Sequence, residues 1–298
     1  GGRLSWTIRG PSPLLFAVTQ ARRVALLVGY DGSSFHGFQR QAGFPTIQES
    51  LEDAWHEISG ERTVVHGSGR TDSGVHAVGQ VAHFSTWSTL SPERVMGGMN
   101  ANLPREIAVK GVVEVGPDFH ARHSALRKSY LYRLAVSPHP PTLERNRVSW
   151  EKVPLDLPRL REALAHLPGT HDFAAFAAAG GRTGSTVRTL LSAHAFPVRG
   201  GINIVFQGDG FLYRQVRNMV GSLIEVGRRN RDPEWVAAVL DGRDRRRAGP
   251  TAAAEGLYLL RVTYPQNPFP GLSGMGARAY PGEAGLPPRP FEIPGSPA

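Results

Sequence analysis

The sequence predicts an α+β protein made of two similar halves that share a largely antiparallel sheet. Hydrophobic periodicity indicates the order strand, helix, strand, strand, helix, strand twice along the chain. This is the split βαβ order of ferredoxin-like domains. A hydrophobic fraction of 40% in 298 residues is compatible with the core that such a fold requires. The natural place for a ligand is then a central cleft between the halves.

The first half contains the helix with the clearest sequence signals. Residues 46–59 begin with Thr46 and Glu49 in a capping box, carry one apolar face and stop at Gly60. A second helix is expected over residues 91–100, because a Ser-Pro-Glu sequence is typical of a helix start. Strands are expected at residues 24–30, 62–65, 80–86 and 107–115.

The second half repeats this order without evident sequence identity to the first. Its middle strands close tightly across residues 199–201, whereas those of the first half are separated by a long loop. The chemistry is therefore expected in the first half, with the second half completing the cleft. The helices are expected at residues 156–167, 212–228 and 233–241, and the strands at 129–136, 193–198, 202–207 and 257–264.

Composition divides the chain into four parts. We expect a flexible N-terminal extension at residues 1–22, a subdomain with the long loop at 23–116, and a C-terminal subdomain at 117–265. Residues 266–298 are rich in Pro and Gly without a periodic pattern, so we expect a disordered tail. We expect neither a signal peptide nor a membrane anchor.

Charge and cysteine content limit the classes of function. The net charge of +9 favours a polyanionic partner, most simply nucleic acid, and makes the predicted cleft basic. Of the 34 basic residues only three are lysine, and either phosphate binding or GC-rich coding accounts for this bias. The absence of cysteine excludes disulfides and thiolate chemistry and fits a cytoplasmic protein.

The long loop, residues 67–76, is the main candidate site. Hairpin connections usually take about two to five residues, so a loop of this length more often belongs to a site. It holds one carboxylate, Asp72, two residues after Arg70. Two interpretations stay open: Asp72 caps the turn and pairs with Arg70 for structure, or arginines hold it ionised as a nucleophile or base. A second cationic cluster, at residues 211–218, lies in the other half.

Several common chemistries are excluded by missing motifs. Gly67 and Gly69 lack the third glycine and the following helix of a dinucleotide fingerprint, and neither a phosphate loop nor a Gly-x-Ser-x-Gly elbow occurs. His120 and His123 lack clear ligand spacing, so we expect RNA contacts or satisfied polar groups rather than a metal site. A single carboxylate argues against glycoside hydrolysis, which usually takes a pair.

A series of short blocks follows the order found in one known family. The blocks are residues 30–33, 37–41, 46–49, 69–77, 100–104, 118–122, 130–132, 216–221 and 255–258. Together they resemble the tRNA pseudouridine synthase A family over about residues 24–265. The Arg-Thr-Asp sequence at residues 70–72 is the most specific match. Phe38 stands where the family usually has tryptophan, and residues 172–176 lack the family's hydroxyl side chains.

The resemblance implies isomerisation of uridine to pseudouridine at positions 38, 39 and 40 of the tRNA anticodon stem-loop. It implies no cofactor and no metal. Asp72 matches the catalytic aspartate, which either attacks the sugar or base or removes a ribose proton. Arg70 and Arg217 match arginines that pair with this carboxylate. Tyr130 matches a tyrosine that stacks on the target base, with help in moving the C5 proton as a second role, and Leu257 is expected to pack against that base.

The resemblance also implies tRNA contacts and a homodimer that holds the substrate across both subunits. A non-catalytic tRNA-binding or chaperone module of the same fold is the alternative function, and a hydrolase of a nucleic-acid glycosidic bond is a third. Asp72, Arg70 and Tyr130 favour the enzyme, because binding alone gives no reason to place an acid near phosphates. The expected RNA-contact residues are Phe119, His120, Ala121, Arg122, His123 and Arg182.

Overall fold

The computed structural model describes residues 21–181 and 184–270. The strands are β1 (Arg22–Tyr30), β2 (His66–Gly67), β3 (His76–Thr86), β4 (Ile107–Val115), β5 (Arg127–Val136), β6 (Ser149–Glu151), β7 (Gly169–Asp172), β8 (Val187–Val198), β9 (Gly201–Gly208) and β10 (Leu257–Thr263). The helices are α1 (Ile47–Ser59), α2 (Pro92–Asn102), α3 (Leu157–Leu164), α4 (Gln215–Gly227) and α5 (Glu234–Gly242), with short 3-10 turns at Phe173–Phe176, Arg245–Arg247 and Ala254–Gly256.

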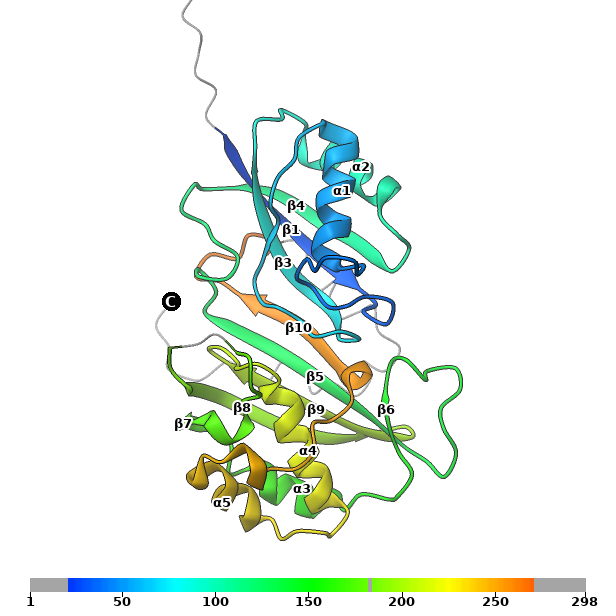
Figure 1. Cartoon of the computed structure of the whole chain (residues 1–298), viewed down its shortest axis with the longest axis vertical. Coiled ribbons are helices and arrows are strands. Elements are labelled where there is room, and N and C mark those ends of the chain that lie inside the picture. Colours follow the sequence, from blue (N-terminus) through cyan, green and yellow to red (C-terminus); the bar gives the residue numbers. More distant parts are fainter. Residues whose placement is uncertain (1–20, 182–183, 271–298) are drawn as a thin grey trace, which may run out of the picture.

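Within these residues all ten strands form one sheet (Figure 1). Their order is β4-β1-β3-β10-β5-β9-β8-β7, with β2 beside β3 and β6 beside β5. The sheet is antiparallel except where β10 meets β3 and β6 meets β5. The predicted α+β class and the mostly antiparallel sheet are therefore confirmed. The last strand of the described residues, β10, lies at the centre of the sheet.

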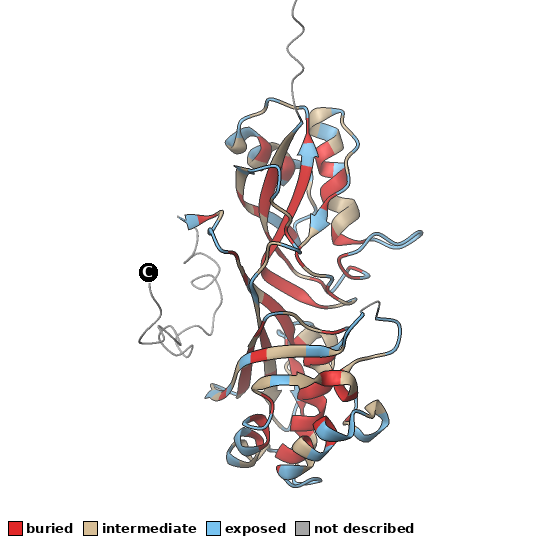
Figure 2. Cartoon of the chain, turned by 90° about the vertical axis from the view of Figure 1, so that its left-hand side faces the viewer, coloured by how far each residue is buried: buried red, intermediate tan, exposed pale blue. Residues whose placement is uncertain are grey.

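The helices form two groups at opposite ends of the sheet (Figure 1). α1 and α2 pack at the end that contains β4 and β1, and α3, α4 and α5 pack at the end that contains β8 and β7. The buried side chains of both groups join one apolar core, and the buried segments run through the strands in Figure 2. A separate small cluster, Val78, Leu131 and Tyr258, comes from strand positions that alternate with the core positions. The strands β10 and β5 therefore lie between the two helical groups.

Local signals placed most elements correctly. The Thr46 hydroxyl accepts the Glu49 N–H at 3.3 Å, and Gly60 ends α1 in a left-handed conformation with φ 72°. Each of these contacts satisfies backbone groups that a helix end leaves unpaired. The predicted strand at residues 107–115 has the same limits as β4. The hairpin of β8 and β9 also forms, across Arg199 and Gly200.

The strand predicted at residues 62–65 is wrong. The Val65 N–H donates to the Glu52 carboxylate at 3.0 Å, and the Thr63 hydroxyl donates to the Ser85 carbonyl at 3.0 Å. Side-chain hydrogen bonds thus replace the ladder, and only β2 pairs with β3. The predicted start of α4 at residue 212 is also wrong. The Leu212 N–H donates to Gln215 Oε1 at 2.8 Å, so the chain makes a tight turn before the helix.

The folded part extends slightly past the expected limits at both ends. Arg22 belongs to β1, and the Phe269 side chain is buried in the core. The greater parts of the predicted extension and tail, residues 1–20 and 271–298, lie outside the described residues. Of the helices that are described, none has the length and apolar character needed to span a membrane.

Gly37→Ala is expected to destabilise the protein by about 2 kcal/mol or more. Gly37 has φ +90°, and a Cβ atom there would lie 2.5 Å from the Thr71 carbonyl oxygen. Gly97→Ala is the matched control, because Gly97 lies inside α2 with open space around its Cβ position. It is expected to raise the unfolding free energy by about 0.5–1 kcal/mol. Urea unfolding measures both; equal stability of the two variants would contradict the close contact between Gly37 and Thr71.

Candidate active site

The loop that carries Asp72 is fixed by the segment before α1. The Phe38 N–H donates to the Thr71 carbonyl at 3.1 Å, and the Ser73 hydroxyl donates to the Phe35 carbonyl at 3.2 Å. The Phe38 ring is buried against Gly67, where a Cβ atom would lie 2.6 Å from it. These contacts hold the backbone on both sides of Asp72, so its carboxylate has a defined direction.

A buried polar network also holds the loop that carries Asp72. The fully buried Gln80 amide donates to the Gly69 carbonyl at 2.8 Å and accepts from the Ser68 N–H and hydroxyl at 3.2 and 2.5 Å. The Tyr30 hydroxyl lies 2.9 Å from the Thr71 hydroxyl. Burial raises the pKa of Tyr30 to about 12, so it stays neutral. Satisfied buried networks of this kind fix one conformation.

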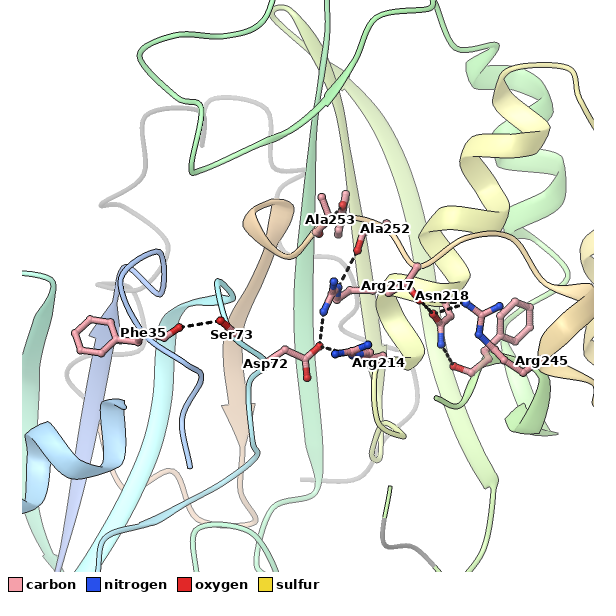
Figure 3. Close-up of polar contacts among 12 residues, drawn as sticks. Phe35, Asp72, Ser73, Arg214, Arg217, Asn218, Arg245, Ala252 and Ala253 are labelled. Carbon is pink, nitrogen blue, oxygen red and sulfur yellow. Dashed lines mark hydrogen bonds and ion pairs between the residues drawn. The ribbon is translucent and has the colours of Figure 1, made fainter. Parts of the chain in front are cut away.

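Asp72 forms ion pairs with two arginines from the start of α4 (Figure 3). Arg217 donates from Nη1 to Asp72 Oδ2 at 2.6 Å, and Arg214 Nε lies 3.7 Å from the same oxygen. The Asp72 and Arg217 side chains are only 16% and 13% exposed. In the described part of the chain, Asp72 Oδ1 has no hydrogen-bond partner. One oxygen is thus held while the other stays available for chemistry.

Arg217 is itself held in place by the segment before β10, which packs against α4. Its Nε donates to the Ala252 carbonyl at 2.8 Å, and the Ala252 N–H donates back to the Arg217 carbonyl at 3.1 Å. The next residue of α4, Asn218, is fully buried and accepts from Arg245 at 3.0 Å and from the Thr251 hydroxyl at 2.7 Å. The Arg245 guanidinium therefore turns inward, although its neighbours Arg246 and Arg247 are exposed.

Tyr130 and Leu257 lie on the two central strands, next to the Asp72 loop. Both are nearly buried, at 8% and 6% exposed, and belong to the same core cluster. A Cβ atom on Gly69 would lie 3.9 Å from the Tyr130 hydroxyl. The Tyr130 ring meets Phe211 edge-on, with centroids 5.0 Å apart. Burial, followed by the charges of Tyr30 and Asp72, raises the pKa of Tyr130, so its hydroxyl keeps its proton at neutral pH.

The predicted pairing of Arg70 with Asp72 does not occur in this structure. Arg70 is exposed, and in the described residues it forms no ion pair with Asp72. The second cation is Arg214, which precedes α4 in the left-handed region with φ 58°. Arg229 and Arg243 have the same conformation where α4 and α5 end, so it is the ion pair with Asp72 that distinguishes Arg214. The cationic cluster at residues 211–218 was the sequence signal for it, but nothing there distinguished Arg214.

The segment predicted to contact RNA is only partly accessible. Ala121 is fully buried: its N–H donates to His83 Nδ1 at 3.2 Å and its carbonyl accepts from Tyr264 at 2.6 Å. Its predicted RNA contact is therefore wrong, because its side chain packs in the core. Phe119 is half-buried against Tyr264, whereas Arg122 and His123 are exposed. Arg182 lies outside the described residues.

His120 belongs to a group of four histidines on β2, on β3 and in the segment between β4 and β5. Its ring centroid lies 4.6 Å from that of His83 and 4.3 Å from that of His123, and His66 stacks on His83. His66, His83 and His120 line a cavity of about 300 Å³ together with Arg23, Thr63, Val64 and Ser85. Across residues 21–181 and 184–270, no group of three or more His, Cys, Asp or Glu side chains is arranged to hold a metal ion.

The unfolding free energy is expected to fall as the pH decreases from about 6.5 towards about 4. Burial, then the charges of His120, His66 and Arg23, lower the pKa of His83 from 6.5 to about 4. In this window the unfolded chain binds a proton that folded His83 does not, so acid favours unfolding. Urea unfolding near pH 7 and near pH 5 measures the loss. His83→Gln should reduce it, and an unchanged loss would exclude His83 as its source.

Comparison with known proteins gives the same assignment along most of the chain. A family model described as tRNA pseudouridine synthase matches residues 26–124 and 163–265. The chain is 46% identical over 248 residues to tRNA pseudouridine synthase A of Rhodospirillum rubrum, covering 82% of this chain and 88% of the relative. It is 44% identical over 250 residues to tRNA pseudouridine synthase A of Thermus thermophilus, covering 82% and 98%. The chain belongs to the tRNA pseudouridine synthase family.

Proposed function

We propose that this protein isomerises uridine to pseudouridine in the anticodon stem-loop of tRNA, at positions 38, 39 and 40. The observation that carries the proposal is the 2.6 Å ion pair between Asp72 and Arg217, beside the enclosed ring of Tyr130. The names of the relatives support both the reaction and the tRNA substrate. An acid held by two arginines, with one free oxygen, supports the role of Asp72 as the catalytic group.

The reaction rearranges one nucleotide and consumes nothing else. The N1–C1′ bond breaks, the uracil rotates while bound, and C5 bonds to C1′. C5 then loses its proton and N1 gains one, so the product has the composition of the substrate. Asp72 Oδ1 either bonds to the sugar or base during the exchange or removes a ribose proton, while Oδ2 stays on Arg217. The proposal therefore includes no cofactor and no metal.

The target base must leave the RNA stack before it reaches Asp72. Eversion costs a few kcal/mol, and contacts to the everted base offset this cost. In the proposal the base stacks on Tyr130 and packs against Leu257, both of which are largely enclosed. Proton acceptance from C5 by Tyr130 would require an ionised phenol, and its raised pKa makes that form rare at neutral pH. Tyr130 therefore acts through stacking in this proposal.

We further propose that residues 23–116 and 117–265 act as two ferredoxin-like subdomains around a basic cleft that holds the stem-loop. The net charge of +9 and the two helical groups at opposite ends of the sheet support this arrangement (Figure 1). RNA stems are recognised mainly by shape and phosphate contacts, which allows several neighbouring uridines to be modified. His120, Arg122, His123 and Arg182 are proposed to contact RNA.

A homodimer in the cytoplasm completes the proposal, as the family resemblance implies. Sedimentation equilibrium tests the dimer directly, with an expected mass twice the chain's 32.3 kDa. A mass equal to one chain at all concentrations and in the presence of tRNA would remove the dimer from the proposal. The chemistry at Asp72 would remain testable, because Asp72, Arg217 and Tyr130 all come from one chain.

Tritium release tests the reaction. Purified protein is incubated with tRNA that carries tritium at uracil C5, and solvent tritium is counted. We expect release from tRNA with uridines at positions 38–40 and none from a tRNA that lacks them. Free uracil as the product would instead indicate a glycosidic hydrolase. Tight tRNA binding without release would indicate the non-catalytic RNA-binding module.

A further inference from the structure

We propose that Lys128, together with Arg122 and Arg188, binds a backbone phosphate of the RNA beside the nucleotide that stacks on Tyr130. This inference rests on the proposed function for the identity of the ligand. It adds a contact site to the residues already assigned, since neither the motif blocks nor the predicted RNA-contact segment includes Lys128 and Arg188. The chemical class of the ligand is a phosphodiester.

Lys128 lies next to the candidate active site. It is two residues before Tyr130 in β5, so both side chains project from the same face of the sheet, about 7 Å apart along the strand. A Cβ atom on Gly69 would lie 3.6 Å from Lys128 Nζ and 3.9 Å from the Tyr130 hydroxyl. The ammonium group and the phenol therefore approach the same point of the Asp72 loop.

The charges around Lys128 lack a counter-ion. In the described residues no carboxylate forms an ion pair with Lys128, Arg122 or Arg188, although the protein has many other ion pairs. Burial, followed by the charges of Arg122 and Arg188, lowers the pKa of Lys128 to about 8. A partly enclosed cation beside two others is unfavourable unless an anion joins them. The free protein thus presents three positive groups that no carboxylate of the described residues pairs with.

A phosphate fits this site better than a protein carboxylate. Lysine binds phosphate as a point charge, and the two arginines add planar forks that suit its oxygens. The nucleotide on Tyr130 carries its phosphates one sugar away from its base, which is the scale of the separation between Tyr130 and Lys128 along β5. Asp72 pairs with Arg214 and Arg217 instead of these cations. Arg188 Nη1 donates to the Ser185 and Val187 carbonyls at 3.0 and 2.5 Å, which leaves its other guanidinium nitrogens for a phosphate.

Salt-dependent tRNA binding tests the assignment. Lys128→Gln is compared with Lys152→Gln, which removes the same charge from an exposed position. Each phosphate contact contributes about 0.7–0.9 to the slope of log K against log salt. We expect Lys128→Gln to lower this slope by about that amount and to weaken binding about tenfold at moderate salt. Lys152→Gln should leave both unchanged, and Lys128→Arg should retain the wild-type slope.

Two further measurements separate this inference from its alternatives. Arg188→Gln changes a half-exposed side chain outside the predicted RNA-contact segment and should lower the salt slope as Lys128→Gln does, which covers the case in which Lys128→Gln fails to fold. An unchanged slope in both variants would overturn the phosphate site. A fall in kcat for Lys128→Gln with unchanged affinity and slope would also overturn it, by assigning Lys128 to the chemistry. Failure of the proposed function appears separately, as absence of tritium release from the wild-type protein.

Discussion

Asp72→Asn is expected to abolish pseudouridine formation, with kcat falling by about 10⁴-fold or more. Asparagine keeps the size of the side chain and can still accept a hydrogen bond from Arg217, which lies 2.6 Å from Oδ2 in the wild-type protein. It loses the charged Oδ1 that either role of the aspartate requires. Single-turnover tritium release with saturating protein measures the loss directly.

Binding of tRNA by Asp72→Asn should stay within about threefold of wild type, because the change removes a negative charge that repels phosphate. Asp241→Asn is the matched control: Asp241 is an exposed carboxylate on α5, and its loss should change neither binding nor rate. Retention of more than about a tenth of the wild-type kcat by Asp72→Asn would exclude Asp72 as the reacting group.

The second large effect is expected at Arg217, where replacement by glutamine should lower kcat by about 10²- to 10³-fold. The change removes the 2.6 Å contact to Asp72 and the 2.8 Å contact to the Ala252 carbonyl. Asp72 then keeps only Arg214, which is 41% exposed and 3.7 Å away. The carboxylate loses its fixed direction, so fewer bound uridines meet it in a reactive geometry.

Arg70→Gln provides the comparison, since it removes the same charge from a side chain that does not pair with Asp72. We expect its kcat to fall by less than about tenfold and any larger effect to appear in tRNA affinity. Equal losses of kcat at Arg70 and Arg217 would contradict the arrangement of ion pairs around Asp72. Thermal unfolding of both variants checks that the sheet remains intact.

The pattern of the sequence predicted most elements because their signals are local. A capping box and a stop glycine define α1, and alternation defines β4 and the hairpin of β8 and β9. The failure at residues 62–65 has a non-local cause: the Glu52 carboxylate of α1 captures the Val65 N–H. No periodicity records such a contact, since it depends on how the helix packs on the sheet.

The candidate site, like the fold, was predicted only in part. Motif blocks predicted Asp72, Tyr130, Leu257 and Arg217; in the structure Asp72 contacts Arg217, and Tyr130 and Leu257 share one core cluster on the central strands. Which arginine serves as the second partner of Asp72 depends on side-chain direction around an irregular turn. The left-handed conformation of Arg214 turns its guanidinium towards Asp72, whereas Arg70, although only two residues from Asp72, is exposed to solvent.

The central place of β10 has a consequence for how the enzyme is made. Residues Leu257–Thr263 join β3 on one side and β5 on the other, yet they are synthesised after every other strand of the described residues. During synthesis on the ribosome, the two ends of the sheet can fold early with their helices. The strands β3 and β5 are joined only when β10 emerges and pairs with both of them. The hydrogen bond from Arg217 to the Ala252 carbonyl also forms only after Ala252, shortly before β10, has been synthesised. We therefore expect a chain cut before Leu257 to lack the strand that joins β3 to β5, so that the two helical groups are no longer held in one sheet.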